Sequence, residues 1–312
     1  MIITEPQSLV AECLRARDRI APTIRTTEIV QEPRTGILLK CENQQVTGSF
    51  KARGGLNALS ALGVDRVVVG SSGNHGIATS WAARQLGIEV TVVMTHTASA
   101  HKREIIRTLG AQVVECTGGN DARTTRVTEI AAQTGAVAVS SYDHPLVVAG
   151  QSTVGLEILD QVPNVHTIVA PVGGGGLLSG IALAVQASGR DVRVLGVEPA
   201  TANDTAQSLA VGHRISIDPP RSICDGVLAQ SPGEFTFPLI QRLVHSVLEV
   251  TDQQVVTAMR DLAELGMTVE PTGALAFAGA RGLPRPEGVV AVISGGNIEP
   301  AQFHRLLAGD AR

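Results

Sequence analysis

A lysine in an unusual setting is the first candidate for chemistry in this sequence. Lys51 lies within TGSFKARGG (47–55), a run of small residues that reads as a loop leading into a helix. A solvated cation at a helix start is the simplest explanation of a lone lysine there, because lysine normally keeps its charge in water. Only three of the 25 basic residues are lysines, however: Lys40, Lys51 and Lys102. Chemistry that requires a primary amine has only these three side-chain candidates, and Lys51 has the most unusual context.

A run of four glycines is the second candidate. Gly173, Gly174, Gly175 and Gly176 follow the apolar run HTIVAPV and precede a helical stretch. Without Cβ atoms, backbone N–H groups can converge on an anion, and a helix start adds partial positive charge. One or two glycines would suffice for a tight turn, so we favour a phosphate site. The loop lacks the features of a P-loop and of a dinucleotide fingerprint, which favours a small phosphorylated cofactor.

Two further polar loops follow apolar runs. SSGNHG (71–76) offers hydroxyls, an amide and an imidazole, which suit either a carboxylate site or an ordinary capped helix start. SGGN (294–297) offers one hydroxyl and by itself is most simply a turn. A primary amine, a phosphate cradle and a carboxylate site, without a metal-ligand cluster of His or Cys, together predict pyridoxal 5′-phosphate. This cofactor requires a lysine, a phosphate site and a polar partner for its ring nitrogen.

The elements that must position these loops alternate between strands and helices. In the first half we expect strands at 66–70, 89–94, 111–116 and 136–141. After about residue 165 we expect further strands at 166–172, 192–199, 245–250 and 288–296. Continuous apolar strands between helices predict parallel sheets that are covered on both faces. Ligands of such sheets bind beyond the carboxyl ends of the strands, where the three loops lie.

The repeat of this pattern predicts two open, mostly parallel, doubly wound α/β domains. A length of 312 residues also suggests about two domains. We expect a small domain over 46–142 and a large domain formed by 1–45 plus 143–312. The first 45 residues are assigned to the large domain because the small unit is complete without them.

Composition restricts the class of protein. Hydrophobic residues make up 44% and charged residues 17%, which predicts a sizeable core. The net charge is −4 and no basic block is present, so we expect neither nucleic acid nor a membrane as a partner. The four cysteines form no CxxC pair, and the sequence shows neither a secretory signal nor an apolar run of membrane-spanning length. A soluble cytoplasmic protein is expected.

Eight motifs resemble one known family when they are taken in order: TGSFKARGG, SSGNHG, AGQSTVGLEI, PVGGGGLLSG, GVEP, DGV, EPTGALA and SGGN. They are similar to the serine/threonine dehydratases and serine racemases, pyridoxal-phosphate enzymes of the tryptophan-synthase-β fold. The resemblance covers about residues 20 to 305. Each motif alone is a weak signal, but eight in order are specific. The resemblance implies a cofactor between two α/β domains, and a homodimer.

The resemblance also implies roles for individual residues. Lys51 would form the Schiff base with the cofactor, Phe50 would pack by its ring, and Asn74 would hydrogen-bond the ring hydroxyl. Ser294 would face the ring nitrogen and leave it unprotonated, which favours elimination over deep carbanion chemistry. The phosphate would be held by Gly173, Gly174, Gly175 and Gly176. The substrate carboxylate would be held by Ser71, Ser72, Asn74 and His75.

Ser72 is also a candidate acid–base group. By the resemblance, its position is often alanine in dehydratases and serine in serine racemases, although hydroxyaspartate dehydratases also carry serine. A serine there can protonate the Cα carbanion from the face opposite Lys51, and racemisation requires two opposed bases. A helix cap or a carboxylate contact is the alternative.

The stretch GVEPATAND (196–204) matches the family's divalent-cation site. Glu198, the backbone carbonyl of Ala202 and Asp204 would supply oxygen ligands, which suit Mg²⁺ or Ca²⁺. The alternative is a strand-end carboxylate and a helix-capping aspartate without a metal.

The expected reaction is an α,β-elimination. It converts a β-hydroxy amino acid (serine, threonine or 3-hydroxyaspartate) to a 2-oxo acid and ammonia, with Lys51 removing the Cα proton. Racemisation, β-replacement and a non-catalytic nucleotide-binding protein are the alternatives. The substrate stays open because Ser140 and Ser141 stand where many relatives have a His-Pro pair, and Leu228 and Ala229 follow the DGV motif where mammalian serine racemases have a substrate-contacting serine.

Overall fold

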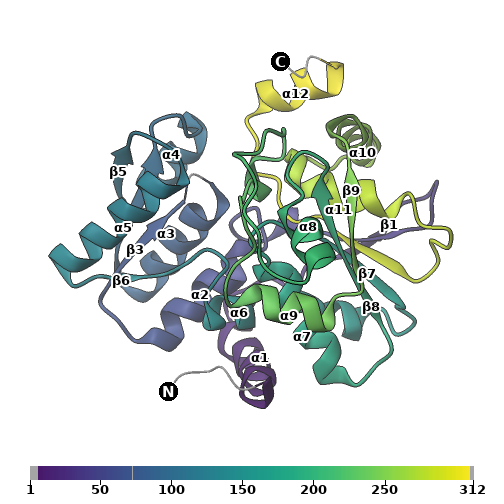
Figure 1. Cartoon of the computed structure of the whole chain (residues 1–312), viewed down its shortest axis with the longest axis horizontal. Helices are drawn as coiled ribbons and strands as arrows, with labels where there is room; N and C mark the ends of the chain where they lie inside the picture. The colour runs from purple at the N-terminus through teal and green to yellow at the C-terminus, as the bar shows by residue number, and fades with distance from the viewer. Residues whose placement is uncertain (1–5, 72, 310–312) are drawn as a thin grey trace.

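The computed structural model describes residues 6–71 and 73–309. Its strands form two separate sheets, which lie side by side in Figure 1. The larger sheet has the order β1-β2-β10-β7-β8-β9, and the smaller has the order β5-β4-β3-β6. The predicted α/β class with two mostly parallel sheets is therefore confirmed.

The six-stranded sheet is parallel except at one edge, where β1 and β2 pair antiparallel. Its strands are β1 (Ile29–Gln31), β2 (Leu38–Lys40), β7 (Thr167–Pro171), β8 (Arg193–Pro199), β9 (Ser246–Val250) and β10 (Val289–Val292). Because β2 pairs with β10 and β1 pairs with β2, the N-terminal segment completes this sheet.

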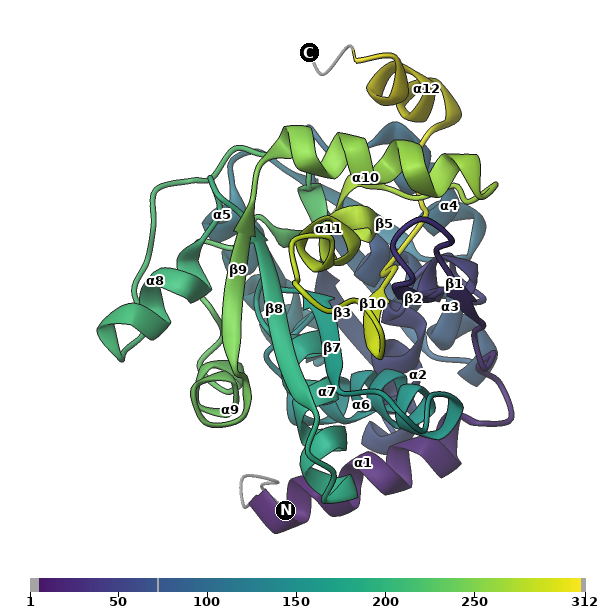
Figure 2. The ribbon, with the colours of Figure 1, turned by 90° about the vertical axis from the view of Figure 1, so that its right-hand side faces the viewer.

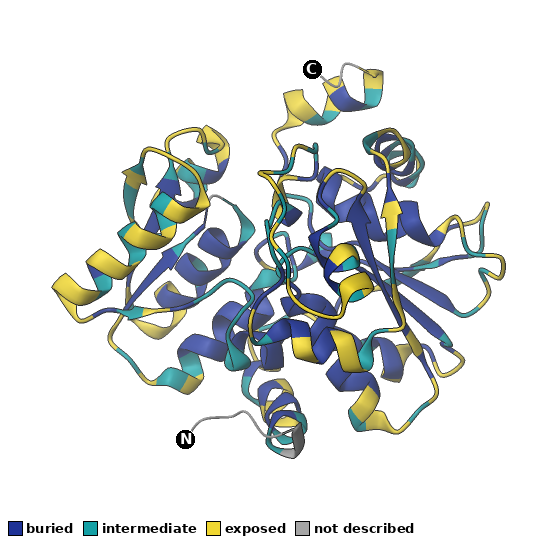
Figure 3. Ribbon diagram, viewed as in Figure 1, coloured by how far each residue is buried: buried dark blue, intermediate teal, exposed yellow. Residues whose placement is uncertain are grey.

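Successive residues of these strands face opposite sides of the sheet, as the two-residue period requires. Val169 and Ala291 pack with helices α10 (Asp252–Glu264) and α11 (Pro271–Ala280) in one core. Ile168 and Val290 pack in a second core with α6 (Pro145–Gln161) and α7 (Gly176–Ser188). Figure 2 shows these helices on the two sides of the sheet, and Figure 3 shows the central strands of the sheet as buried.

The four-stranded sheet is parallel throughout. Its strands are β3 (Arg66–Gly70), β4 (Glu89–Thr95), β5 (Gln112–Cys116) and β6 (Val137–Ala138). Val67 and Val69 pack against helices α2 (Lys51–Leu62), α3 (Asn74–Leu86) and α4 (Ala100–Thr108), whereas Val68 packs against α5 (Asn120–Thr134). The remaining helices are α1 (Pro6–Ile20), η1 (Glu42–Gln44), α8 (Asp204–Val211), η2 (Asp225–Val227), α9 (Thr236–Leu243) and α12 (Pro300–Ala308).

Helices α2 and α6 lie together between the two sheets (Figure 1). They approach closely at Gly150, where a Cβ would stand only 2.6 Å from the carbonyl oxygen of Arg53. Arg53, a residue of α2, is fully buried. Its side chain forms charge-assisted hydrogen bonds of 2.8 Å to Glu42 and 2.6 Å to Glu157. Glu157 also accepts a 2.6 Å bond from the buried Lys40. This neutral group of four charges fixes the helix that begins with Lys51.

Two predicted strands are much shorter than expected. The strand predicted over 288–296 is limited to β10, Val289–Val292, because the chain then enters the SGGN loop. The sequence predicts a strand over 136–141, but β6 ends at Ala138. Beyond it, the Ser140 hydroxyl accepts hydrogen bonds from the N–H groups of Tyr142 and Asp143, which turns the chain away from the sheet. In the described part of the chain, no helix has the length and apolar character needed to cross a membrane.

Candidate active site

Lys51 is the first residue of α2, the helix that lies between the two sheets (Figure 1). Its Nζ donates a 2.8 Å hydrogen bond to the carbonyl oxygen of Ser141 and lies 5.0 Å from the centre of the Phe50 ring. Burial lowers the pKa of Lys51 from 10.5 to about 8. A lysine with this pKa has a substantial neutral fraction near physiological pH, which both nucleophilic and base chemistry require.

The segment that precedes Lys51 is held by the SGGN loop. The Phe50 N–H donates to the carbonyl oxygen of Ser294 at 3.1 Å, and Ser49 forms a β-bridge with Gly295. Gly48 has a φ of +72°, in the left-handed region that favours glycine. The SGGN loop follows β10, so a strand of the large sheet places Lys51 next to Ser294. The Ser294 hydroxyl is buried and donates to the carbonyl oxygen of Thr272 at 3.2 Å.

Asn74 begins α3 at the end of the SSGNHG loop and reaches across to the same region. Its side-chain oxygen accepts a 2.8 Å hydrogen bond from Asn297, and its amide nitrogen donates to Glu270. The backbone N–H of Glu270 in turn donates to the carbonyl oxygen of Gly295 at 3.2 Å. The loops after β3 and β10, one from each sheet, therefore meet at Asn74.

Glu270 also belongs to an ion cluster that joins the two sheet units. Lys102, on α4, lies 3.1 Å from a carboxylate oxygen of Glu270 and 3.1 Å from one of Asp225. Burial by itself would lower the pKa of Lys102, but the charges of Glu270 and Asp225 outweigh this effect and raise the pKa. Lys102 is therefore a permanent cation beside the site.

The four-glycine loop follows β7 and opens α7, as predicted. Gly175 has a φ of +94°. A Cβ on Gly173 would stand 2.9 Å from the Val227 Cα, and one on Gly174 would collide with the Tyr142 ring. Side chains are excluded from this loop, which leaves its backbone as the surface that a ligand can contact.

Of the other predicted carboxylate contacts, Ser71 follows β3 and His75 lies in the first turn of α3. Ser71 is buried, and its hydroxyl accepts a 3.2 Å hydrogen bond from the Gly73 N–H. His75 is buried, and burial together with the nearby Lys51 charge lowers its pKa to about 3, so the imidazole is neutral. Ser72 lies outside the described residues.

The predicted metal ligands lie at the end of β8 and the start of α8. Glu198 is fully buried and accepts 3.0 Å hydrogen bonds from the N–H groups of Thr205 and Ala206. Among the described residues, neither carboxylate oxygen of the buried Asp204 has a hydrogen-bond partner. Burial raises the pKa of Glu198 to about 7, and burial with the Glu198 charge raises that of Asp204 to about 8. No cluster of three or more His, Cys, Asp or Glu side chains suited to a metal is found in 6–71 and 73–309.

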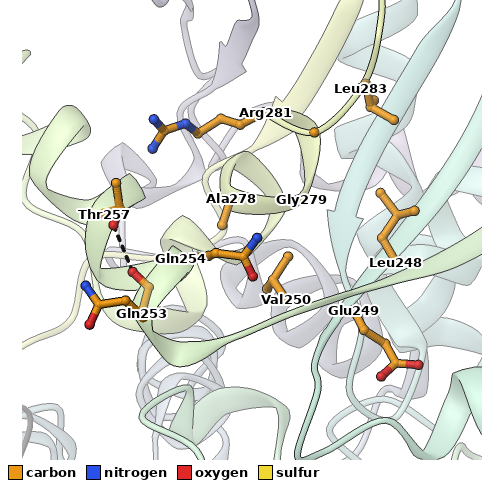
Figure 4. Close-up of a pocket in the computed structure, with 11 residues that line it drawn as sticks. Leu248, Glu249, Val250, Gln253, Gln254, Thr257, Ala278, Gly279, Arg281 and Leu283 are labelled. Carbon is orange, nitrogen blue, oxygen red and sulfur yellow. Dashed lines mark hydrogen bonds between the residues drawn. The ribbon is translucent and has the colours of Figure 1, made fainter.

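Lys51 does not line either of two surface cavities. One, of about 490 Å³, lies between β9, α10 and α11 (Figure 4). Its lining includes Glu249, Gln253 and Arg281 and, among the described residues, none of the predicted site residues. The other, of about 520 Å³, is lined by residues such as Asn43, Met267 and Asn297. The candidate active site is thus defined by converging loops.

The residues present fit pyridoxal phosphate. A half-buried lysine with a lowered pKa lies beside the buried Ser294 hydroxyl, and a glycine loop opens a helix at the carboxyl end of β7. A sequence profile described as "Pyridoxal-phosphate dependent enzyme" matches residues 18–295. The chain belongs to this family of pyridoxal-phosphate dependent enzymes.

Individual relatives of this pyridoxal-phosphate enzyme span nearly its whole length. An L-threo-3-hydroxyaspartate ammonia-lyase of Saccharomyces cerevisiae is 36% identical over 96% of both chains. The serine racemase of Homo sapiens is 36% identical over 92% of this chain and 89% of its own. The solved structure of maize serine racemase superposes with a TM-score of 0.89 at 32% identity, covering 96% of this chain and 97% of its own. The resemblance predicted from the eight motifs is confirmed.

The sequence reasoning did not single out Glu270, Lys102, Asp225 or Asn297 as parts of the site. Glu270 and Asp225 lie in the motifs EPTGALA and DGV, and Lys102 is one of the three lysines. Those signals were present, but their convergence depends on which helix faces which strand end.

Proposed function

We propose that this enzyme is an ammonia-lyase (dehydratase) that converts a β-hydroxy amino acid to a 2-oxo acid and ammonia. The observation that carries the proposal is the half-buried Lys51, whose amine has a pKa lowered by desolvation to about 8 and lies beside the Ser294 loop. The ammonia-lyase name of the yeast relative supports the same reaction class.

The proposed roles are those that the family resemblance implies, and the positions of the residues support them. Lys51 would hold the cofactor aldehyde and, as a free amine, remove the proton from the substrate Cα. The backbone of Gly173–Gly176 would hold the phosphate, Phe50 would pack by the ring, and Asn74 would hydrogen-bond the ring hydroxyl. The bound cofactor would supply an electron sink for the charge that develops at Cα. The neutral Ser294 hydroxyl at the ring nitrogen would limit that sink, which favours loss of the β-hydroxyl.

The substrate class is proposed as serine, threonine or 3-hydroxyaspartate. Ser71, Ser72, Asn74 and His75 would hold its carboxylate. The neutral His75 can donate one ring N–H to a carboxylate without placing a second cation beside Lys51.

Racemisation of an amino acid is the second candidate function. The serine at position 72 and the similarity to the human serine racemase favour it. Lys51 and Ser72 would then act as bases on opposite faces of Cα.

We further propose a divalent-cation site formed by Glu198, the Ala202 carbonyl and Asp204. Two buried carboxylates with raised pKa values support it, because a Mg²⁺ or Ca²⁺ ion would supply the positive charge that their surroundings lack. We also propose a small domain over 46–142 with the rest as the large domain, a homodimeric assembly and a cytoplasmic location. The two separate sheets support the division into two domains. The free thiols of all four cysteines support the cytoplasmic location.

A substrate panel tests the proposed function. Purified protein with Mg²⁺ would be given both enantiomers of serine and threonine and the threo and erythro 3-hydroxyaspartates. Release of 2-oxo acid and the chirality of the recovered amino acid would be measured together. Oxo acid with unchanged chirality supports the lyase, and inverted amino acid with little oxo acid supports the racemase. Absence of a yellow, borohydride-fixable cofactor on Lys51 would overturn both.

A further inference from the structure

The side chain of Tyr142, in the segment that follows β6, packs closely against the glycine loop. The Tyr142 ring lies against Gly174 so closely that any Cβ there would collide with it. A Cβ on Gly176 would likewise stand 2.9 Å from the Tyr142 Cα and 3.0 Å from its carbonyl oxygen. The contact with Tyr142 therefore requires glycine at positions 174 and 176, whether or not a ligand binds the loop.

The residue after Tyr142 anchors this segment to α9. The Asp143 carboxylate accepts hydrogen bonds from the backbone N–H groups of Glu234 and Phe235 at 2.9 Å and of Thr236 at 3.2 Å. Three backbone donors at a helix start bind a carboxylate firmly, because charge-assisted bonds and the helix dipole add together.

The same turn before α9 also holds the glycine loop. The Thr236 hydroxyl donates to the carbonyl oxygen of Gly174 at 2.6 Å, and the Gly233 N–H donates to that oxygen at 3.2 Å. Gly174 is therefore fixed on one side by the turn and on the other by the Tyr142 ring, and Asp143 fixes the ring relative to the turn.

We propose that Tyr142 and Asp143 are positioning residues that shape the glycine loop for phosphate before the cofactor binds. The inference rests on the proposed assignment of the phosphate to Gly173–Gly176. A loop that is already ordered loses less conformational freedom on binding, so its pre-formation increases affinity. Pre-formation of the loop should increase affinity for the phosphate group and not for the aldehyde, because the aldehyde would be bound by Lys51.

The test compares pyridoxal phosphate with pyridoxal, which has the same aldehyde and ring but no phosphate. The apo forms of the wild type, Tyr142→Phe, Tyr142→Ala and Asp143→Ala would be titrated with each compound, and binding followed by absorbance. Phe303→Ala, on the remote helix α12, is the control for the loss of a half-buried aromatic ring. Circular dichroism and thermal unfolding would confirm that each variant is folded.

We expect Tyr142→Ala and Asp143→Ala to weaken pyridoxal phosphate binding by about tenfold or more and to leave pyridoxal binding within about twofold. Tyr142→Phe, which keeps the ring, and Phe303→Ala should match the wild type for both compounds. An equal loss of both compounds in Tyr142→Ala, or no loss of either, would overturn the positioning role. A wild-type protein that binds neither compound would instead overturn the proposed function, so the two failures are distinguishable.

Discussion

The Lys51 amine donates a 2.8 Å hydrogen bond to the carbonyl oxygen of Ser141, although 90 residues separate the two in sequence. Lys51 begins the helix α2, and Ser141 lies in the segment that leaves the small sheet after β6. The bond holds the ammonium in a site where burial disfavours its charge, so the charged lysine costs folding free energy.

The variant Lys51→Met should stabilise the apo protein near neutral pH. Lowering the lysine pKa from 10.5 to about 8 corresponds to a burial penalty of about 3 kcal/mol, and the lost bond to Ser141 offsets about 1 kcal/mol. The penalty is complete below pH 8 and disappears as the pH rises from 8 to 10.5, because the unfolded chain then holds the extra proton. Urea unfolding should show the variant about 2 kcal/mol more stable at pH 7. The advantage should vanish by pH 10.5, and a difference that does not change with pH would contradict the assignment.

The variant Lys102→Met should destabilise the protein strongly. It leaves the buried Glu270 carboxylate without its cation, which typically costs about 3–5 kcal/mol. Adding Glu270→Gln should recover part of the loss, and a double-mutant cycle by urea unfolding would give the coupling between the two side chains.

Arg66→Met is the matched control for Lys102→Met, because the Arg66–Glu89 pair is exposed. It should cost less than about 1 kcal/mol. Equal losses for the exposed and the buried pair would show that Lys102 has no special role.

The metal proposal predicts that Mg²⁺ stabilises the wild type and not Asp204→Asn. At a concentration of about 100 times the Kd, the ion should add about 2.7 kcal/mol to the free energy of unfolding by mass action. Thermal unfolding with increasing Mg²⁺ or Ca²⁺, against a chelator, measures this effect. Asp218→Asn, at an exposed position, should respond as the wild type does. A wild type whose unfolding temperature does not change with either ion would contradict the proposed cation site.

The variant Ser72→Ala separates the two candidate reactions. If Ser72 is the second base, the variant should lose at least about 100-fold in racemisation and keep most of its elimination, because general acid–base groups typically contribute 10²–10⁴-fold. The ratio of inverted amino acid to oxo acid, measured in one reaction, serves as its own control. An equal fall in both rates would instead indicate a carboxylate contact.

The sequence determined the fold class because the apolar runs of the strands and the helical stretches between them are local signals. Apolar runs such as RVVVG (66–70) become buried parallel strands wherever helices cover both faces, and β3 forms as predicted. The family followed from eight ordered motifs, and Lys51 stood out because lysine is rare here. The lengths of β6 and β10 differed from the prediction. β10 ends at Val292, before the glycines of the SGGN loop. β6 is short because the Ser140 hydroxyl competes for backbone N–H groups in a way that strand propensity does not reveal.

Only the tertiary structure decided which distant groups meet. Nothing in the sequence shows that Lys102 reaches Glu270 and Asp225, or that the Tyr142 ring lies on Gly174, because each contact joins separate elements through the relative placement of two sheets. The lowered pKa of Lys51 and the raised pKa of Asp204 likewise arise from burial, a property of the packed fold. The residue types specify which chemistry is available to the enzyme, and packing specifies the charge states and the neighbours with which that chemistry operates.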